Sequence, residues 1–473
     1  MGVHMFEPSI REELVSIVGP RHFLDDATSL LSYSYDATPV VQSLPDGVIF
    51  PASTEEVANI VRVCAKHVIP IVARGAGSNL CGGTVPVSGG LVIAMRRMNR
   101  LLELDEENLT ATIQPGLNTK EFHNRVEQAG LFYPPDPSSM IICTMGGNIA
   151  LGAGGLRGLK YGTTKDYVLG LEAVLASGEV IRTGGKLVKD VAGYDLTRLL
   201  VGSAGTLAII TQATVKLIPR VPYRRALVAM YRSLDEAART VSRIVAARIT
   251  PCTLEFMDQA TTRVVENYAK IGLPVDARAI LAIEQDGDED QVQRDLSAIA
   301  DICRAEGAFA VRVAATPEEG AQVMEARRSA LSALARLRPT TILEDATVPR
   351  SEIAAMVMEI ERIAAKYDVQ ISTFGHAGDG NLHPTATTDA RDTEELHRVE
   401  QAFEEIFATS VSLGGTITGE HGVGLVKAPY LEWKVGKAGV EIMQGIKRAF
   451  DPQNILNPGK IFAQTRKRVV VQR

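Results

Sequence analysis

The sequence predicts a two-domain α+β protein without a Rossmann fold, and three observations support this prediction. The chain has 473 residues, more than one hydrophobic core usually serves. Short apolar runs and glycine-rich turns fill the first part, whereas strands and amphipathic helices alternate after Pro219 and Pro222. A glycine-rich segment at 74–90 leads into a strand and not into a helix. We expect a domain boundary near residue 220.

The composition is that of an ordinary globular protein. Hydrophobic residues make up 45% and charged residues 22% of the chain, so a large core can form. A net charge of −6 argues against nucleic-acid or anionic-membrane binding as the main task. The five cysteines form no CxxC pair, which excludes an iron–sulfur or zinc cage built from local thiolates. The sequence has no apolar run of ~20 residues and no signal pattern, so we expect a cytoplasmic protein without a transmembrane segment.

The segment 48–73 predicts a strand, a helix and a second strand. The run VIF leads into Ser53, and Ser53 with Glu56 predicts a capping box at the start of a helix. Apolar residues from Val57 to Cys64 then form one helical stripe, and IPIVA at 69–73 predicts the next strand. The segment is therefore expected to be a βαβ unit.

The stretch RGAGSNLCGGTVPVSGG at 74–90 carries six glycines. Gly75 and Gly77 fit a dinucleotide fingerprint, but Leu80 occupies the third position, and no helix fits before the strand LVIAM. A flexible connector is the alternative, although strands flank the loop closely on both sides. Backbone amides in such a loop form concave nests that suit a pyrophosphate.

Three further runs of small residues follow, PPDPSS at 134–139, MGGNIALGAGG at 145–155 and VGSAGTLAIIT at 201–211. Such runs recur where the backbone approaches a ligand closely or adopts positive φ. Four of them in one domain indicate a ligand long enough to touch several loops. A flavin dinucleotide fits this better than a single phosphate.

Helices are predicted by apolar periodicity and capping residues along the rest of the chain. One begins after Asn118, with Glu121 three residues on. Others are expected at about 235–247, 258–270, 288–306, 316–336 and 351–367.

The stretch FGHAGDGNLHPT at 374–385 predicts a hairpin that carries two histidines. With strands at 369–374 and 382–388 and a turn at 378–381, His376 and His383 would lie directly opposite each other. Opposed residues have Cβ atoms ~5 Å apart, so both imidazoles could bind one cation. The alternative is that both are hydrogen-bonding histidines in tight turns.

A metal site needs a third ligand, and the turn GGTITGEHGVG at 414–424 offers Glu420. Nitrogen and oxygen ligands suit zinc, iron or manganese equally well. An ion that binds the hydroxyl oxygen of a 2-hydroxy acid would lower its pKa and orient the α-carbon for hydride transfer to flavin. His421 would then accept the proton as general base. Arg327 or Arg328 offers a guanidinium for the substrate carboxylate, although solvated helix arginines are the alternative.

These motifs resemble the FAD-linked oxidases of the vanillyl-alcohol oxidase / p-cresol methylhydroxylase superfamily, in the branch of the glycolate oxidase flavin subunit and D-lactate dehydrogenase. The resemblance extends from PASTEEVANIVRVC through RGAGSNLCGG, YPPDPSS, MGGNIA and GYDLTRLLVGSAGTLAIIT to LEFMD, GHAGDGNLH, GEHGVG and FDPQNILNPGKIF. It implies an FAD-binding domain of two α+β subdomains at 1–220 and a ferredoxin-like α+β substrate cap at 221–410. It further implies a segment at 411–473 that returns to the flavin.

The resemblance also implies roles for individual residues. His376, His383 and Glu420 match the family's metal ligands, His421 its base and Arg327 its substrate arginine. The loop at 74–79 would bind the pyrophosphate, and the other matching positions would surround the rest of the FAD. The expected FAD-binding residues are Arg74, Gly75, Ala76, Gly77, Ser78, Asn79, Pro135, Asp136, Gly146, Gly147, Asn148, Gly205, Ile210 and Asn457.

Two departures from the family's pattern bear on substrate size. Met324 stands where relatives often carry Trp, and Thr385 stands where relatives that act on larger dicarboxylic hydroxy acids tend to carry Asn. Both indicate a small substrate such as D-lactate or glycolate, with D-2-hydroxyglutarate or a different alcohol as alternatives. No residue matches a covalent flavin attachment point, so we expect non-covalent FAD.

The sequence shows no iron–sulfur or haem motif, so electrons must leave the flavin for another acceptor. We expect a protein acceptor, either an electron-transfer flavoprotein or an iron–sulfur subunit, with a quinone or oxygen as alternatives. A homodimer is compatible with the sequence. Two further classes compete with the dehydrogenase reading, a metal hydrolase without flavin and a non-catalytic electron-transfer or scaffold subunit.

Overall fold

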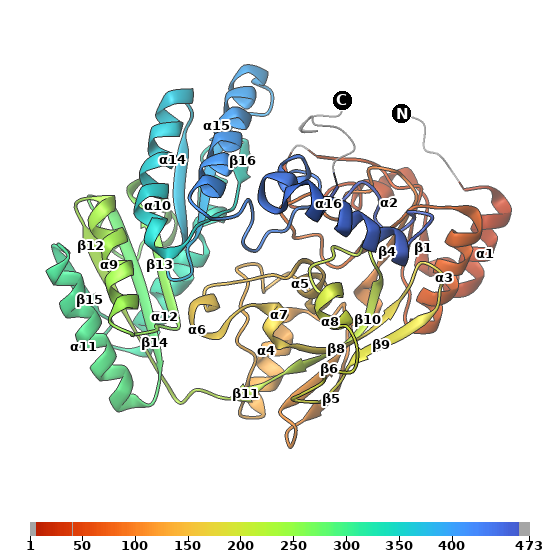
Figure 1. Ribbon diagram of the computed structural model, residues 1–473, viewed down its shortest axis with the longest axis horizontal. Helices are drawn as coiled ribbons and strands as arrows, with labels where there is room; N and C mark the ends of the chain where they lie inside the picture. The colour runs from red at the N-terminus through yellow and green to blue at the C-terminus, as the bar shows by residue number, and fades with distance from the viewer. Residues whose placement is uncertain (1–5, 40, 463–473) are drawn as a thin grey trace. The chain divides into compact units, whose positions relative to one another are not determined.

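The computed structural model describes residues 6–39 and 41–462, so the last part of the predicted C-terminal segment, 463–473, lies outside the described residues. The described chain forms two compact units. Unit 1 comprises the residues up to Ala153, Thr163–Arg220 and the chain from Glu420 on, and unit 2 comprises Gly154–Gly162 and Val221–Gly419. After Arg220 the chain therefore stays in unit 2 up to the glycine-rich turn before Glu420, where it returns to unit 1 (Figure 1).

Two sheets form the centre of unit 1 in its described residues. In the first, β2, β4 and β3 are parallel and β1 pairs antiparallel with β2, whereas the second is antiparallel in the order β5-β6-β10-β8-β9. β7 and β11 form a separate antiparallel pair. The strands are β1 (Phe23–Leu24), β2 (Gly47–Ile49), β3 (Ile71–Arg74), β4 (Leu91–Ala94), β5 (Leu101–Asp105), β6 (Thr110–Ile113), β7 (Leu131–Phe132), β8 (Val168–Val174), β9 (Val180–Gly184), β10 (Ile209–Lys216) and β11 (Ile218–Pro219).

Helix α3 (Thr54–His67) links the parallel strands β2 and β3, which confirms the predicted βαβ unit. Ser53 Oγ accepts from Glu56 N at 3.1 Å, but the Glu56 carboxylate accepts from Ala52 N at 2.7 Å and not from Ser53 as a capping box would have it. The other helical elements of unit 1 are α1 (Pro8–Val18), α2 (Ala27–Leu31), α4 (Thr119–Gln128), α5 (Met145–Leu151), α7 (Thr164–Tyr167), α8 (Leu196–Leu200), α16 (Leu431–Phe450), η1 (Pro20–His22), η2 (Met95–Arg97) and η4 (Ala428–Tyr430).

Unit 2 is built on one antiparallel sheet in the order β15-β12-β14-β13-β18-β19-β16, with β17 also paired to β19. Its central strands carry near-continuous apolar residues because helices cover the sheet. The strands are β12 (Tyr223–Tyr231), β13 (Thr253–Asp258), β14 (Ala279–Gly287), β15 (Ala310–Val313), β16 (Thr340–Leu343), β17 (Ala346–Thr347), β18 (Ile371–His376) and β19 (Asn381–Thr388).

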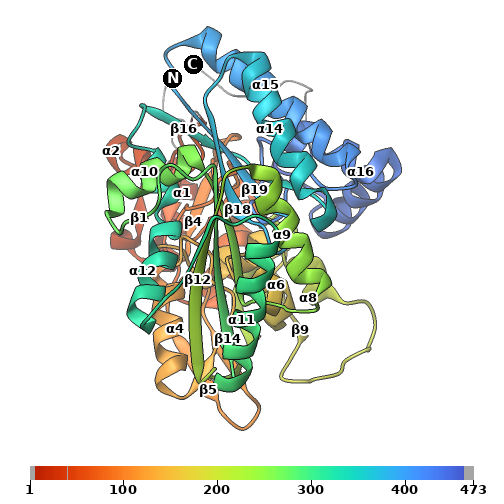
Figure 2. The same cartoon turned by 90° about the vertical axis from the view of Figure 1, so that its left-hand side faces the viewer.

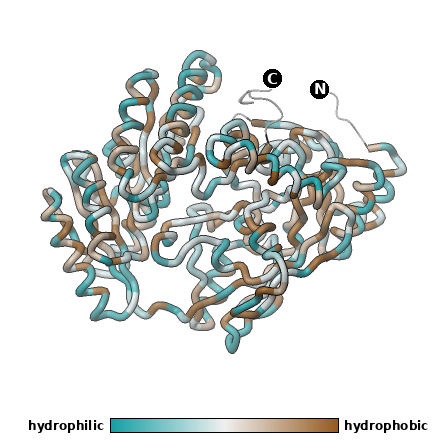
Figure 3. The backbone as a smooth tube through the Cα atoms, in the orientation of Figure 1, coloured by the Kyte–Doolittle hydropathy of each residue, from teal (hydrophilic) through white to brown (hydrophobic). Residues whose placement is uncertain are grey.

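The helices of unit 2 confirm the predicted amphipathic segments, with one break. α9, α11 and α12 contact β12 and β14 (Figure 2). Hydrophilic and hydrophobic residues alternate along α9 and α11 (Figure 3). The helix expected at 316–336 is interrupted at Ser329, whose hydroxyl donates to Ala326 O at 2.7 Å. The elements are α6 (Gly158–Tyr161), α9 (Leu234–Ala246), α10 (Gln259–Ala269), α11 (Glu289–Ala305), α12 (Pro317–Arg328), α13 (Ala330–Leu334), η3 (Arg350–Glu352), α14 (Ile353–Tyr367) and α15 (Thr393–Ser412).

Within the described ranges, no helix combines the length and apolar character needed to cross a bilayer.

A buried carboxylate in unit 2 makes stability depend on pH. Burial raises the pKa of Asp258 to about 6, although its oxygens accept from Thr261 N and Thr373 N. A raised pKa means that the folded state prefers the protonated acid, so this stability is present below pH ~4 and is lost as the pH rises through 6. Asn carries no charge at either pH, so we expect the unfolding free energy of Asp258→Asn to increase relative to that of the natural protein between pH 4 and pH 7. Urea unfolding at both pH values measures it; a constant difference would contradict it.

Candidate active site

The two predicted histidines lie in one hairpin, but not directly opposite each other. His376 ends β18 and pairs with Asn381, whereas His383 pairs with Phe374. The predicted register was wrong because the connection is 377–380, which places Gly380, with φ +88°, at its last position. His376 and His383 are therefore diagonal neighbours on one face of the sheet, with ring centroids 5.0 Å apart.

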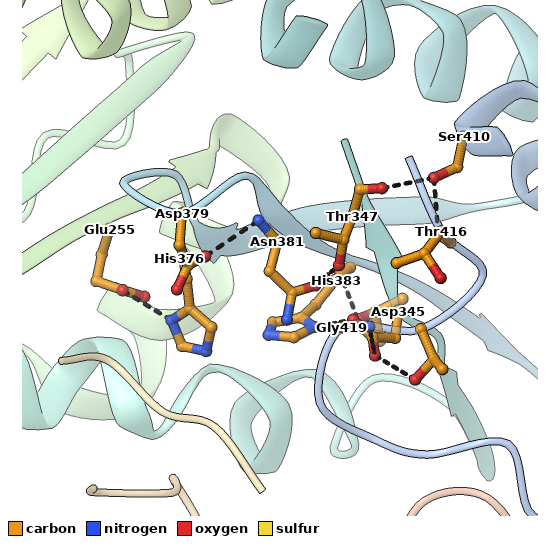
Figure 4. A network of polar contacts seen from close by, with 12 residues as sticks. Glu255, Asp345, Thr347, His376, Asp379, Asn381, His383, Ser410, Thr416 and Gly419 are labelled. Atoms are coloured by element: carbon orange, nitrogen blue, oxygen red, sulfur yellow. Dashed lines mark hydrogen bonds and ion pairs between the residues drawn. The ribbon is translucent and has the colours of Figure 1, made fainter. Parts of the chain in front are cut away.

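The alternation of side chains collects further polar residues on this face of the sheet. Directly paired residues of antiparallel strands point to the same side. β13 pairs with β18 so that Met257 lies opposite Phe374, which places Glu255 on the same side as the two histidines. Figure 4 shows Glu255 beside His376.

Glu420 completes a ligand set with the hairpin. One ligand atom from each of His376, His383 and Glu420 lies within 4.8 Å of the other two. Both histidines are almost fully buried, each 3% exposed. Two imidazoles and one carboxylate at this spacing are a suitable donor set for a divalent ion with an open coordination position.

Asp345 fixes the turn that carries Glu420. Its Oδ2 accepts from Gly419 N at 2.7 Å (Figure 4). The same oxygen accepts from Thr418 Oγ1 at 2.8 Å. Thr347 and Thr416 exchange backbone hydrogen bonds next to it, and Ser410 Oγ donates to the carbonyl oxygens of both. Gly419, the residue before Glu420, is thus anchored to Asp345, which lies between the two strands β16 and β17 that pair with β19.

His383 also belongs to a second ligand set, with Asp345 and His421. Asp345 Oδ1 lies 4.0 Å from His383 Nδ1. The two sets share His383, so one imidazole is within reach of both the predicted metal position and the predicted base.

Arg327 is the large cation of this face. It lies at the end of α12, is 1% exposed, and its Nη2 is 2.6 Å from Glu255 Oε2. Its guanidinium carbon is 4.6 Å from the ring centroid of Phe374, a cation–π distance. Arg328 is half-buried. Arg327 therefore shares a partner, Glu255, with His376 of the hairpin.

The glycine-rich loop in unit 1 follows β3, as predicted, and contains no helix. Gly77 adopts φ +73°, and a Cβ there would lie 2.2 Å from Arg74 Nη2. Arg74 donates to Tyr35 O at 2.6 Å, while Asp36 accepts from Thr84 N at 3.1 Å. The loop 74–84 is therefore held against residues 35 and 36, and only glycine fits at position 77.

Asn457 joins the small-residue runs of unit 1. Its Nδ2 donates to Gly83 O at 2.9 Å and to Ala204 O at 2.7 Å, and Ala204 N donates to Ala150 O at 2.7 Å. Asn457 of the C-terminal segment thus joins two of the four runs directly and a third run through Ala204. Asn457 Oδ1 is buried without a hydrogen-bond partner among the described residues. An exogenous donor, such as a flavin N–H, would satisfy it.

The remaining predicted cofactor residues lie in unit 1 beside these runs. Pro135 O contacts His123 Nε2 at 3.0 Å, and Asp136 is fully buried. Gly146 approaches Pro115 so closely that a Cβ would lie 2.4 Å from it, and Asn148 Nδ2 donates to Thr119 Oγ1 at 2.9 Å. The others are Gly75, Ala76, Ser78 and Asn79 in the loop after β3, Gly147 in α5, Gly205 before β10 and Ile210 in β10.

We expect Asn457→Ala to lower the affinity for FAD and the stability of unit 1. The substitution removes both hydrogen bonds of the side-chain amide and places alanine at φ +43°. Together these changes should lower the unfolding free energy by about 2–4 kcal/mol. FAD release during urea titration, followed by flavin fluorescence, measures the effect. Asn454→Ala is the matched control, because Asn454 is exposed and has φ +54°. Equal losses in both variants would show that the backbone conformation, and not the amide, is responsible.

The sequence analysis missed several buried charged residues, both beside the two-histidine hairpin and near the glycine-rich loop of unit 1. Glu255 stands in the apolar strand TLEFM, and Asp345 follows ILE in a similar setting. An acidic residue in an apolar strand indicates a buried carboxylate with a partner, and the sequence shows this signal at both positions. Lys460, whose Nζ donates to Val85 O at 2.7 Å, gave no such signal because it lies in the loop segment NPGK.

Comparison with known proteins assigns this chain to a family. Residues 220–461 match the C-terminal domain of the FAD linked oxidases, and residues 45–184 match an FAD binding domain. The chain belongs to the FAD-linked oxidases. It is therefore an FAD-dependent oxidoreductase, and the small-residue runs of unit 1 lie within or beside the matched FAD binding domain.

Relatives and solved structures agree with this assignment. The FAD-linked oxidase described here is 61% identical over 470 residues to the glycolate oxidase subunit GlcD of Bacillus subtilis (strain 168), covering 99% of this chain and 100% of that protein. It is 34% identical to the D-lactate dehydrogenase of Anaerostipes hadrus, covering 96% and 97% of the two chains. The structure of p-cresol methylhydroxylase with substrate bound superposes with a TM-score of 0.82 at 17% identity, covering 97% and 98%.

The structural likeness confirms the predicted fold class. The 4-ethylphenol oxidase from Gulosibacter chungangensis also superposes, with a TM-score of 0.79 at 19% identity over 96% of this chain and 97% of that one. An FAD-binding domain without a Rossmann fold, joined to an α+β domain, is thus shared with the vanillyl-alcohol oxidase / p-cresol methylhydroxylase superfamily. The flavin-free hydrolase considered from the sequence is excluded by the family.

Proposed function

We propose that this FAD-linked oxidase oxidises a small 2-hydroxy acid, D-lactate or glycolate, to the 2-oxo acid. Relatives named glycolate oxidase subunit and D-lactate dehydrogenase, aligned over nearly the whole chain, support FAD-dependent oxidation of a 2-hydroxy acid. The observation that carries the proposal is the ligand set of His376, His383 and Glu420, whose donor atoms lie within 4.8 Å of one another.

We infer that these three residues hold one divalent ion, either zinc, iron or manganese. The two imidazoles and the carboxylate fit such an ion, and both histidines are buried where water competes poorly. When bound, the ion would acidify and orient the substrate hydroxyl, and FAD would accept the hydride. His421 would take the hydroxyl proton, and Arg327 would bind the substrate carboxylate through its guanidinium.

The interior of unit 1 supports non-covalent binding of FAD. Cys81 is the cysteine of the glycine-rich loop, and burial raises the pKa of its thiol to about 12. A thiol with such a pKa is almost wholly protonated at neutral pH and is a poor nucleophile. We propose that hydrogen bonds from the loop 74–79 and from Asn457 retain the cofactor.

Two buried side chains support a small substrate. Met324 is 3% exposed and packs with Ala226, Ala282 and Ala314 in an apolar cluster. Thr385 is fully buried in β19 and its hydroxyl donates to His383 O at 3.2 Å. A threonine in this position presents no amide to a second carboxylate of a dicarboxylic hydroxy acid.

We propose that a protein, either an electron-transfer flavoprotein or an iron–sulfur subunit, accepts the electrons. The support is the sequence, which has no CxxC motif for an iron–sulfur centre of its own. The alternative acceptor is a quinone.

We expect D-lactate or glycolate to bleach the flavin absorbance of the purified protein under anaerobic conditions. The screen compares lactate, glycolate and 2-hydroxyglutarate, each chiral acid as both enantiomers. Bleaching by D-2-hydroxyglutarate alone would contradict the small-substrate proposal. A flavin that none of these acids bleaches would contradict the proposed function and favour an electron-transfer or scaffold subunit.

A further inference from the structure

Glu255 is a fully buried carboxylate next to the hairpin, and the proposed mechanism does not use it. It lies in the middle of β13, a strand that pairs with β14 on one side and with β18 on the other, and it is 0% exposed. A buried charge needs partners that compensate for the loss of water. Both of its oxygens have one.

The two oxygens of Glu255 contact residues with different proposed roles. Oε1 lies 2.8 Å from His376 Nδ1, and Oε2 lies 2.6 Å from Arg327 Nη2 (Figure 4 shows the first contact). The guanidinium is in turn held over Phe374, the cross-strand partner of His383. One side chain therefore touches both a metal-ligand candidate and the substrate-arginine candidate.

The contact with His376 fixes which ring nitrogen carries the proton. A carboxylate beside a guanidinium can only accept a hydrogen bond, so Nδ1 must donate. The lone pair then resides on Nε2, which points away from Glu255. Partners of this kind orient metal-binding imidazoles and raise their basicity.

We propose that Glu255 is a positioning residue that sets the His376 tautomer and ties it to Arg327, so that the metal ligand and the carboxylate-binding arginine are held by one group. This proposal rests on the proposed function for its metal. It adds that the order of both groups depends on a residue that touches neither ion nor substrate.

The test compares three variants of the full FAD-loaded protein. Glu255→Gln removes the charge, Arg327→Met leaves the contact with His376, and Asp286→Asn is a matched control on β14. Asp286 is 3% exposed and paired with Lys160 at 2.5 Å, so the control loses an equally buried carboxylate elsewhere on the sheet. The readouts are the Kd for Zn²⁺ by chelator competition and the substrate concentration at half-maximal flavin bleaching.

We expect Glu255→Gln to weaken Zn²⁺ binding by about 10–100-fold and also to raise the half-maximal substrate concentration. Arg327→Met should raise only the substrate concentration, and Asp286→Asn should leave both within about twofold. Loss of both properties in Glu255→Gln but not in Asp286→Asn distinguishes positioning from the general effect of removing a buried carboxylate. Zn²⁺ binding by Glu255→Gln within twofold of the natural protein would overturn the proposal.

Nitrogen-15 NMR of labelled histidine decides the case independently of any metal. The His376 signals, assigned by their loss in His376→Gln, should show a protonated Nδ1 and a bare Nε2 in metal-free protein. If Glu255→Gln does not fold, Glu255→Leu/Arg327→Met removes both buried charges and should lose this tautomer preference. A protonated Nε2 in the natural protein would refute the role of Glu255. Absence of metal binding in the natural protein, with the expected tautomer, would refute the proposed metal role alone.

Discussion

We expect His383→Ala to retain FAD, to lose the divalent ion and to lose turnover by roughly 10³-fold, since a catalytic metal contributes several kcal/mol to transition-state stabilisation. His383 supplies an atom to the proposed metal set and lies in unit 2, whereas the predicted FAD residues lie in unit 1. Metal content by elemental analysis, flavin absorbance and anaerobic bleaching rate measure the three properties.

The matched control for this substitution is His397→Ala. Its side chain is 68% exposed on α15, so its removal should change none of the three properties. Chelation of the natural protein should reproduce the loss in His383→Ala, and added Zn²⁺ or Mn²⁺ should reverse it only in the natural protein. Full activity after complete removal of the metal would refute the metal role.

We expect Arg327→Met to raise the half-maximal substrate concentration and to destabilise the protein by about 3–5 kcal/mol, because the buried carboxylate of Glu255 loses its cationic partner. Carboxylate binding contributes to the ground state and the transition state alike, so the maximal bleaching rate should change less than the substrate concentration. Rates across a substrate titration and urea unfolding curves measure the two effects.

Arg328→Met is the control for Arg327→Met, since it removes the same group one residue further along α12. Arg328 is half-buried, so we expect a smaller change in stability and no change in substrate requirement. An increased substrate requirement in Arg328→Met, with Arg327→Met unaffected, would show that the neighbouring arginine binds the carboxylate.

Short motifs predicted the local structure well where the signal lies within a few residues. The helix after Ser53, the helix-free glycine loop after β3 and the helix after Asn118 all appear in the structure. The predicted hairpin register was wrong because two four-residue turns, 377–380 and 378–381, fit the sequence AGDGN equally well. Only backbone pairing of β18 with β19 selects among them.

The pairing of distant residues could not be predicted from local patterns. Glu255 meets His376 across 121 positions of sequence, and Asn457 meets Gly83 across 374. Neither separation follows from the helical or strand period or from the residue spacing of a known motif. The clue available for Glu255 was its charge within an apolar strand, which predicts a partner without naming it.

The sequence by itself supplied the residue types and short motifs from which the FAD-linked family and the candidate site were predicted, because glycines, imidazoles and carboxylates are informative within such motifs. It indicated a flavin dinucleotide, a hairpin with two histidines and a Gly-Glu-His-Gly turn. The tertiary structure alone decided which groups act together. Strand order in the sheet of unit 2 brings Glu255 to His376, and the return of the C-terminal segment brings Asn457 to the glycine-rich loop. Such contacts depend on the packing of whole strands and segments, whose free energy is distributed over many residues and is encoded in no single motif.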